Sequence, residues 1–592
     1  MADRYWVGGT AAWNTSSTTV WSATSGGASG ASVPTAADNV IFDSATVYTV
    51  TLTGALACLS FTVSAGTVTF TSTGTLAVSG SFLIIAGTVW SATGTITFNS
   101  TTTGNTITTN NVSLAAVVTF NGVGGGWGFG SAFSSSASTA VNLLAGAVAT
   151  NNYTFTFTGA TAGLLSNTGT SVRSFTLGSS TLNISGLAPI NFSTSTALTL
   201  DAGTSSIVCS SASPTFTGGG KTFYNVSMTT VGASTKTIAN SNTFNNLTLA
   251  STTGTRETIL IFNGNTTVLG TLTLGTSASP VSRMLMRSSL NGTPRTFNVA
   301  AVATLAEVDF SDVVVTGASA PWSGTRLGDC GGNSGITFAA GVNKYWNLVA
   351  GGNWSDTAWA LTSGGVAAAA NYPLPQDTAI IDNVGLIVGN TITIQNVWQI
   401  GTLDASGRTL AATLSVGSGY LYGNLTLSTA VTPAGAGTFI VAGRGTQTIT
   451  PAGRTFTNPW SLQSANGIIA FAGAVTSTST ITMSQGTIQF LAGSTNTATT
   501  FAIAGSAAAP VYLTSSTPGT QATLSQTTGT VNASFATISD NNATGGATWQ
   551  GLSANNAIDA GNNTGWVFDI PYGSVIFQQP VRLRSFTERG RD

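Results

Sequence analysis

The fold is decided by the stretch Lys221-Thr-Phe-Tyr-Asn-Val-Ser-Met228, because a second version of it follows as Asn242-Thr-Phe-Asn-Asn-Leu-Thr-Leu249. Both contain T-F-x-N-[VL]-[ST]-[ML], and Phe223 and Phe244 are 21 residues apart (244 − 223). Apolar residues alternate with Thr, Ser or Asn, which is the two-residue period of a β-strand. A short strand that recurs about every twenty residues predicts a β-solenoid, in which each coil stacks on the previous one and buries a continuous apolar column.

Short alternating runs of the same kind fill most of the chain. No long segment has apolar residues at helical spacing, so we expect almost no helix. A row of tandem β-sandwiches is the alternative, because sandwiches also consist of many short strands, but the chain lacks the Cys…Trp…Cys pattern of immunoglobulin domains. Clear examples of predicted strands are residues 59–63, 67–70, 75–78, 95–98, 154–157 and 174–177.

The composition fits stacked strands. Only 6% of the residues are charged, against a usual share of about a quarter. The 28 Phe and 13 Trp residues predict a folded chain rather than a disordered one. In-register stacking would place like charges about 4.8 Å apart, whereas Thr, Ser and Asn can form hydrogen bonds along such a ladder.

Charge and hydropathy exclude several classes of partner. The net charge is −1, so neither nucleic acid nor a membrane surface is an expected partner. The longest apolar runs are far shorter than the roughly 20 residues of a membrane-spanning helix. The first residues do not resemble a secretory signal peptide, so we expect synthesis in the cytoplasm, followed by retention there or by exit through another route such as lysis.

Two long segments of the chain are variants of one another. Arg4–Asp43 and Lys344–Asp382 each place an aromatic pair after a basic residue, followed by W-x-x-T-S-G-G and P-x-x-x-D-x4-D. A stack of strands has open ends with unpaired backbone groups and an exposed core. We therefore expect each of these opening segments to be a Trp-rich N-terminal cap.

A second duplicated phrase marks the ends of the two repeats. Asp329–Phe338 and Asp559–Phe568 share D-x-G-[GN]-N-[ST]-G-[IW]-[TV]-F. The sequence thus predicts two tandem β-solenoid units, each with an N-terminal cap and a Gly/Asn-rich closing turn. The predicted parts are the first cap (1–43), the first body and closing module (44–340), the second cap (341–382), the second body and closing module (383–570) and a basic tail (571–592).

Few residues of this chain could carry catalysis. Histidine is absent, which removes the usual general base and the commonest metal ligand. The three cysteines are far apart in sequence, so we expect buried thiols rather than disulfides or a metal site. No catalytic residue, metal ligand or cofactor is predicted. The cysteines are Cys58, Cys209 and Cys330.

Carboxylates are also scarce in the predicted bodies. Between Asp43 and Glu307 the chain contains only Asp201 and Glu257, so a pair suited to glycoside hydrolysis is not expected. A calcium loop is conceivable in the two closing phrases, but the later Glu of an EF-hand is missing, and we favour closing turns.

Two segments are candidate contact sites. Trp127 and Phe129 lie in the glycine-rich run 122–130, where they could stack on sugar rings, although burial under a loop is the favoured interpretation. The tail combines an apolar triplet with four arginines and is a candidate anchor on an acidic neighbour, unless it is disordered. The candidate anchor residues are Val575, Ile576, Phe577, Arg582, Arg584, Arg589 and Arg591.

The opening R-Y-W-V-G-G…W and the closing D-x-G-N-N-T-G-W resemble modules of tailed-bacteriophage virion proteins of the fibre or appendage type. These openings and closings also resemble segments of large bacterial surface proteins of β-solenoid build. The resemblance covers the caps only and implies a virion or adhesive role, without assigning a role to any residue. The second opening departs from the pattern after its Trp, with Asn347-Leu-Val.

Together these features predict a non-enzymatic phage virion structural protein, namely a tail fibre or spike that contacts the host surface. The alternatives are a capsid decoration or head-fibre protein anchored by its tail, and a polysaccharide depolymerase or bacterial surface adhesin. Expected partners are other virion proteins, a glycan or protein of the host surface, and copies of the chain itself. A trimer is favoured among homo-oligomers because fibres are often trimeric, although no heptads specify one.

Overall fold

The computed structural model describes residues 1–230, 234–249, 258–275 and 283–569. Strands account for 51% of the protein and form a β-solenoid of about 23 turns. The described residues contain no α-helix, and their two labelled helical elements are single 3-10 turns, η2 (Ala369–Asn371) and η3 (Ser553–Asn555). The predicted all-β fold and its β-solenoid architecture are confirmed.

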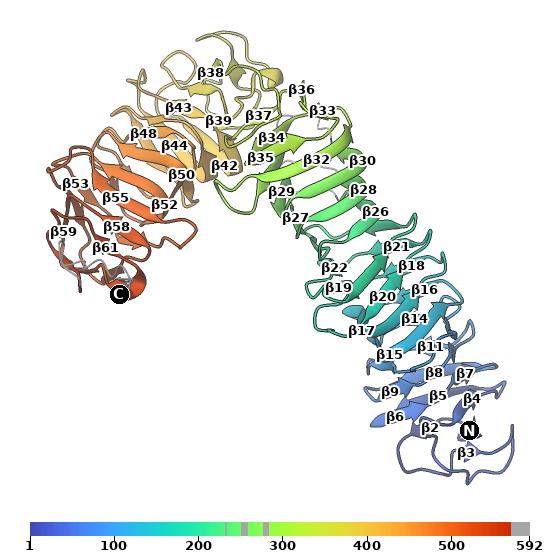
Figure 1. The fold of residues 1–592 in the computed structure, drawn as a ribbon. Helices are drawn as coiled ribbons and strands as arrows, with labels where there is room; N and C mark the ends of the chain where they lie inside the picture. The colour runs from blue at the N-terminus through green and yellow to red at the C-terminus, as the bar shows by residue number, and fades with distance from the viewer. Residues whose placement is uncertain (231–233, 250–257, 276–282, 570–592) are drawn as a thin grey trace, which may run out of the picture. The chain divides into compact units, whose positions relative to one another are not determined.

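The chain divides into two compact units. The first consists of Met1–Val342 together with the short segment Leu374–Gln376. The second consists of Asn343–Pro373 and the described residues from Asp377 onward. Each unit contains its own stack of strands, which Figure 1 shows in blue to green for the first unit.

In the first unit, strands of successive coils pair in parallel and in register. β26 (Thr222–Met228) pairs with β28 (Asn242–Leu249), with Phe223 opposite Phe244 and Asn225 opposite Asn246. The repeat seen in the sequence is therefore one coil of the solenoid. This parallel pairing contradicts the β-sandwich alternative, because sandwiches consist of antiparallel sheets.

The predicted strands form with small shifts at their ends. Their apolar residues point inward and their Thr and Ser residues face outward, as the alternating burial of Thr67–Thr71 shows. The structure has β7 (Phe61–Val63), β8 (Thr67–Thr71), β9 (Thr75–Val78), β12 (Ile96–Phe98), β18 (Phe155–Phe157) and β20 (Arg173–Thr176).

The core of the first unit begins as a column of aromatic rings. Phe61 and Phe82 stack one coil apart, with ring centroids 4.9 Å apart and an interplanar angle of 14°. The three cysteines are buried, as predicted. Burial raises the pKa of the Cys209 thiol to about 12, so this sulfur stays protonated at neutral pH.

The second unit follows the same plan. Its largest sheet has 17 strands and includes β50 (Trp460–Phe471), β52 (Thr480–Phe490) and β55 (Val511–Ser515). β52 pairs in parallel with both of the others. The outer faces of these strands present mainly Thr, Ser and Gln side chains.

Antiparallel pairs of labelled strands occur at only two places in the described chain, and both are at the opening segments. β1 (Asp3–Trp6) pairs antiparallel with β3 (Trp21–Ser22), and β38 (Asn343–Trp346) pairs antiparallel with β40 (Trp359–Ala360). On its other side each first strand pairs in parallel, β1 with β4 (Asn39–Phe42) and β38 with β41 (Thr378–Ile380). The two opening segments thus share one strand arrangement.

Candidate functional site

Trp127 and Phe129 are not a surface contact site, because both side chains are buried, with 2% and 1% exposure, which agrees with the favoured interpretation. They lie at the end of β15 (Val118–Phe129), where Trp127 packs on Phe120 with ring centroids 5.2 Å apart. A Cβ atom added at Gly125 would lie 2.7 Å from the Trp127 ring. The glycines make room for a buried indole rather than forming an exposed bend.

The candidate virion anchor lies outside the described residues and stays a prediction. It comprises Val575, Ile576, Phe577, Arg582, Arg584, Arg589 and Arg591.

Three buried indoles form the centre of the first opening segment. Trp21 lies between Trp6 and Trp13, with ring centroids 5.1 and 5.2 Å away in edge-to-face contact. The Trp6 Nε1–H group donates a hydrogen bond to the Gly9 carbonyl at 2.9 Å. All three rings also contact Phe42, the last residue of β4, so the indoles cover the first aromatic layer of the column.

The second opening segment repeats this cluster. Trp359 lies between Trp346 and Trp354, at centroid distances of 5.3 and 4.6 Å, again edge to face. The Trp346 Nε1–H group donates to the Leu348 carbonyl at 2.9 Å. The residue that corresponds to Phe42 is Ile381, which is buried, so the aromatic ring of the first unit has an aliphatic counterpart in the second.

The first closing phrase is a turn held by its own side chains. Asp329 Oδ1 accepts hydrogen bonds from the Gly331 N–H group at 2.8 Å and from Asn333 Nδ2 at 2.7 Å. Asn333 Nδ2 also donates to the Phe310 carbonyl at 2.8 Å, and Asn333 Oδ1 accepts from the Val313 N–H group at 2.9 Å. The turn is thereby attached to the coil beneath it.

The second closing phrase makes the same four bonds. Asp559 Oδ1 accepts from Gly561 N at 2.9 Å and from Asn563 Nδ2 at 2.7 Å. Asn563 donates to the Ile538 carbonyl at 2.7 Å and accepts from Asn541 N at 3.0 Å. In both phrases a donor group of the Asn faces the carboxylate, which suits a turn and opposes a calcium loop.

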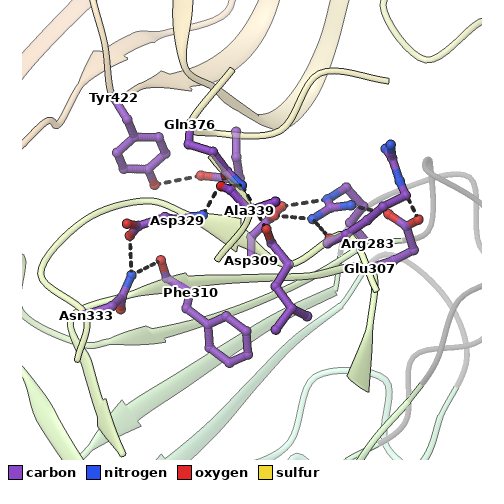
Figure 2. Close-up of polar contacts among 12 residues, drawn as sticks. Arg283, Glu307, Asp309, Phe310, Asp329, Asn333, Ala339, Gln376 and Tyr422 are labelled. Atoms are coloured by element: carbon purple, nitrogen blue, oxygen red, sulfur yellow. Dashed lines mark hydrogen bonds and ion pairs between the residues drawn. The ribbon is translucent and has the colours of Figure 1, made fainter. Parts of the chain in front are cut away.

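A buried ion cluster lies next to the first closing turn (Figure 2). Arg283 Nε donates to Asp309 Oδ2 at 2.9 Å, and its two Nη atoms form ion pairs with Asp309 and Glu307. Arg326 Nε donates to Glu307 Oε1 at 2.7 Å. Arg283, Glu307 and Asp309 are exposed by only 2%, 7% and 1%. Both carboxylates are thus neutralised by arginines inside the fold, which is the usual condition for burying charge.

Gln376 completes the polar network in Figure 2. It belongs to the short segment Leu374–Gln376 of the first unit, which lies in the sequence between two segments of the second unit. Its Oε1 accepts from the Asp329 N–H group at 2.9 Å, and its Nε2 donates to the Leu327 carbonyl at 3.0 Å. The closing turn is therefore fixed from two sides.

Other carboxylates of interest also serve turns. Asp382 Oδ1 accepts from the Val384 N–H group at 2.9 Å, and Asp201 Oδ1 accepts from the Gly203 N–H group at 3.1 Å. Burial alone would raise the pKa of Asp38, but hydrogen bonds from Thr35 and the charge of Arg4 hold this pKa below its ordinary value. Glu257 lies outside the described residues.

Sequence reasoning missed three further buried cations. The side chains of Arg173, Lys236 and Arg408 are each 1% exposed, and desolvation lowers the pKa of each. Two of them donate to backbone carbonyls of a neighbouring coil, Arg173 Nη1 to Thr196 O and Arg408 Nη2 to Ile387 O, whereas Lys236 Nζ donates to the nearby Thr230 carbonyl. For Arg173 and Lys236 the available signal was an alternating position on the inward face of a strand, as in Arg173-Ser-Phe175. Arg408 lies between β43 (Thr402–Asp404) and β44 (Ala412–Leu421), where alternation gives no signal.

The described residues contain no group of three or more Cys, Asp or Glu side chains that could hold a metal ion. None of their helices is long and apolar enough to cross a membrane. Comparison with known proteins found no match to a family model, a curated protein or a solved structure.

Proposed function

We propose that the chain is a non-enzymatic virion structural protein of a tailed bacteriophage, namely a tail fibre or spike-type appendage that contacts the host surface. The observation that carries the proposal is the stack of in-register strands, whose outer walls present mainly neutral hydroxyl and amide side chains. Such a stack offers a long, regular surface for contact and needs no reactive group.

The placement of the scarce charged residues supports a structural role. Glu307 and Asp309 are paired with arginines in the core, and Asp329 and Asp559 accept the bonds of closing turns. Carboxylates committed in this way are poor general acids or bases, because catalysis needs a group free to exchange a proton with a substrate.

The proposal includes two capped solenoid units in tandem. Each unit begins with an indole cluster over its first coil and ends with an Asp-Gly-Asn turn over its last. Caps of this kind would cover the exposed core and the unpaired strand edges of a stack. We expect the assembled protein to be a homo-oligomer, with a trimer favoured, in contact with other virion proteins.

Immunogold labelling of intact virions with an antibody against the chain tests this function. Label along tail appendages is the expected result, and label on the capsid would favour a head-fibre or decoration protein instead. Absence of label from virions that do display a known tail protein would contradict the virion role. Light scattering on the purified chain tests the oligomeric state, for which we expect the mass of a trimer.

A further inference from the structure

The outer wall of the second unit contains a small hollow beside an exposed tyrosine. The hollow has a volume of about 310 Å³ and is lined by Tyr512 on β55, Gln485 and Thr487 on β52, and Asn466 and Ile468 on β50. Ligand sites usually span about 300–1,000 Å³, so this hollow is at the small end of that range. Pro510, which immediately precedes β55, forms part of its rim.

Register places the lining side chains on one column of the outer face. Ile468 is opposite Thr487, and Thr487 is opposite Tyr512, on three successive coils. Tyr512 is 46% exposed, whereas Ile468, Gln485 and Thr487 are half-buried. The partly exposed Tyr512 ring therefore lies at one end of a short row of side chains, and the strands that carry this row are paired in the sheet.

Two features of the backbone leave space for the hollow. The pairing of β50 with β52 is irregular between Gln463 and Ile468, which opens the ladder beside Gln485. Gly486 has a φ of +84°, and a Cβ atom there would collide with the Ser464 carbonyl. A side chain at this position would push the two coils apart at the floor of the hollow.

The chemistry of the lining indicates one class of ligand. An aromatic face beside amide and hydroxyl groups can pack against the C–H face of a sugar ring while the amides bind its hydroxyls. No charged residue lines the hollow, which leaves an acidic sugar without a counterion. We propose that this hollow binds a neutral hexose unit of a glycan.

This inference rests on the proposed function and deepens it, because it names a neutral glycan as the component of the host surface that the chain contacts. Tyr153, which is 38% exposed in the first unit, provides a matched control because it does not line this hollow. Asn466 has a left-handed φ of +59°, so Asn466→Gly removes the amide without straining the backbone.

The test is binding of the purified full chain to oligosaccharides of glucose, galactose and N-acetylglucosamine, measured by saturation-transfer NMR and by a glycan array. Oligomers of glucuronic acid provide the acidic comparison. We expect binding to at least one neutral series, and a loss of about tenfold or more in affinity for Tyr512→Ala, as for an aromatic hot spot. Tyr512→Phe should keep most of the affinity, Asn466→Gly should weaken it, and Tyr153→Ala should leave it unchanged.

The proposal is overturned if the chain binds no neutral oligosaccharide, if Tyr512→Ala binds as well as the unmodified protein, or if the glucuronic acid oligomers bind more tightly. Circular dichroism of each variant shows whether it folds. Glycan binding that depends on Tyr512 would stand even if virions carried no antibody label, so failure of the proposed function and failure of this site are distinguishable.

Discussion

The two opening segments keep the same indole cluster and differ in the layer beneath it. In the first, Trp21 and its two neighbouring indoles contact Phe42, and the column continues through Phe61 and Phe70. In the second, the same arrangement forms around Trp359, and the residue that corresponds to Phe42 is the buried, aliphatic Ile381. The cluster is thus repeated although the corresponding residue of the next strand differs, as the proposed role of a cap would require.

The two closing phrases likewise share one structure, while the residues beneath it differ. Their Asp-Gly-Asn turns make four equivalent hydrogen bonds, but the coil beneath them differs. When Asp312 is aligned with Asp540, Glu307 and Asp309 of the ion cluster correspond to Phe535 and Thr537 in the second unit. The turn is repeated, whereas the ion cluster belongs to the first unit alone.

Removing the central indole of each cluster should give the largest effect. Trp21→Ala and Trp359→Ala are each expected to lower the free energy of unfolding by about 3–5 kcal/mol, because a large cavity is left in a packed core. Trp21→Ala should lose more, since Trp21 contacts three aromatic rings and Trp359 contacts two. Urea denaturation measures both, with Val366→Ala, at an 88% exposed position, as the control.

Equal losses would show that the aromatic layer beneath the cluster adds nothing. Full stability combined with loss of cell binding would contradict the role of the cluster as a cap and make the opening segment a contact surface.

Breaking the ion cluster should cost slightly less. Arg283→Ala leaves Glu307 and Asp309 buried without their main partner, and loss of one partner of a buried pair costs about 3 kcal/mol or more. The combined variant Arg283→Met, Glu307→Phe, Asp309→Thr removes all three charges, takes its Phe and Thr from the second unit, and should recover most of this loss. Thermal and urea denaturation compare the two variants. If the combined variant is as unstable as Arg283→Ala, the closing coil of the first unit requires the charges themselves.

The two closing turns should respond alike to one substitution. Asn333→Ala and Asn563→Ala each leave a backbone N–H group and two acceptors without their partner, at a cost of about 1–3 kcal/mol. Hydrogen exchange of the Val313 and Asn541 amides reports the opening of each turn directly. Clearly different losses would show that the environment beneath the turn, rather than its own four bonds, sets its stability.

The smallest expected effect is a dependence on pH in the first opening segment. The pKa of Asp38 is lowered in the folded protein, so its stabilising contribution is fully present above the ordinary pKa of 3.8 and is lost as the pH falls through the folded value. Asp38→Asn should therefore reduce the loss of stability between pH 5 and acidic pH. Denaturation curves at a series of pH values measure this change. An unchanged acid response in the variant would contradict the role of Asp38.

The strand period, the parallel stack and the buried thiols could be predicted from the sequence, because alternation and repeat length are local properties. The side-chain partners could not be predicted. Arg283 and Asp309 are 26 residues apart, and this separation depends on the number of residues in the turns of each coil. Phe175 and Leu200 are stacked partners 25 residues apart, against 21 for Phe223 and Phe244, so no fixed period places one coil on the next.

Trp127 could not be assigned to the core with certainty from the sequence, for a related reason. Glycines usually indicate an exposed bend, but here they leave the space that an indole fills from within. The sequence alone does not show which nearby side chain fills the space that a glycine leaves.

The in-register pairing of each strand with one in the next coil also bears on how the protein is made. A coil such as that of Phe244 can dock on the coil of Phe223 as soon as about twenty more residues have left the ribosome, because no contact with a distant part of the chain is needed. Each finished coil then provides the template for the next. The protein can therefore assemble in the order of its synthesis, with the first indole cluster in place before the second unit has been translated.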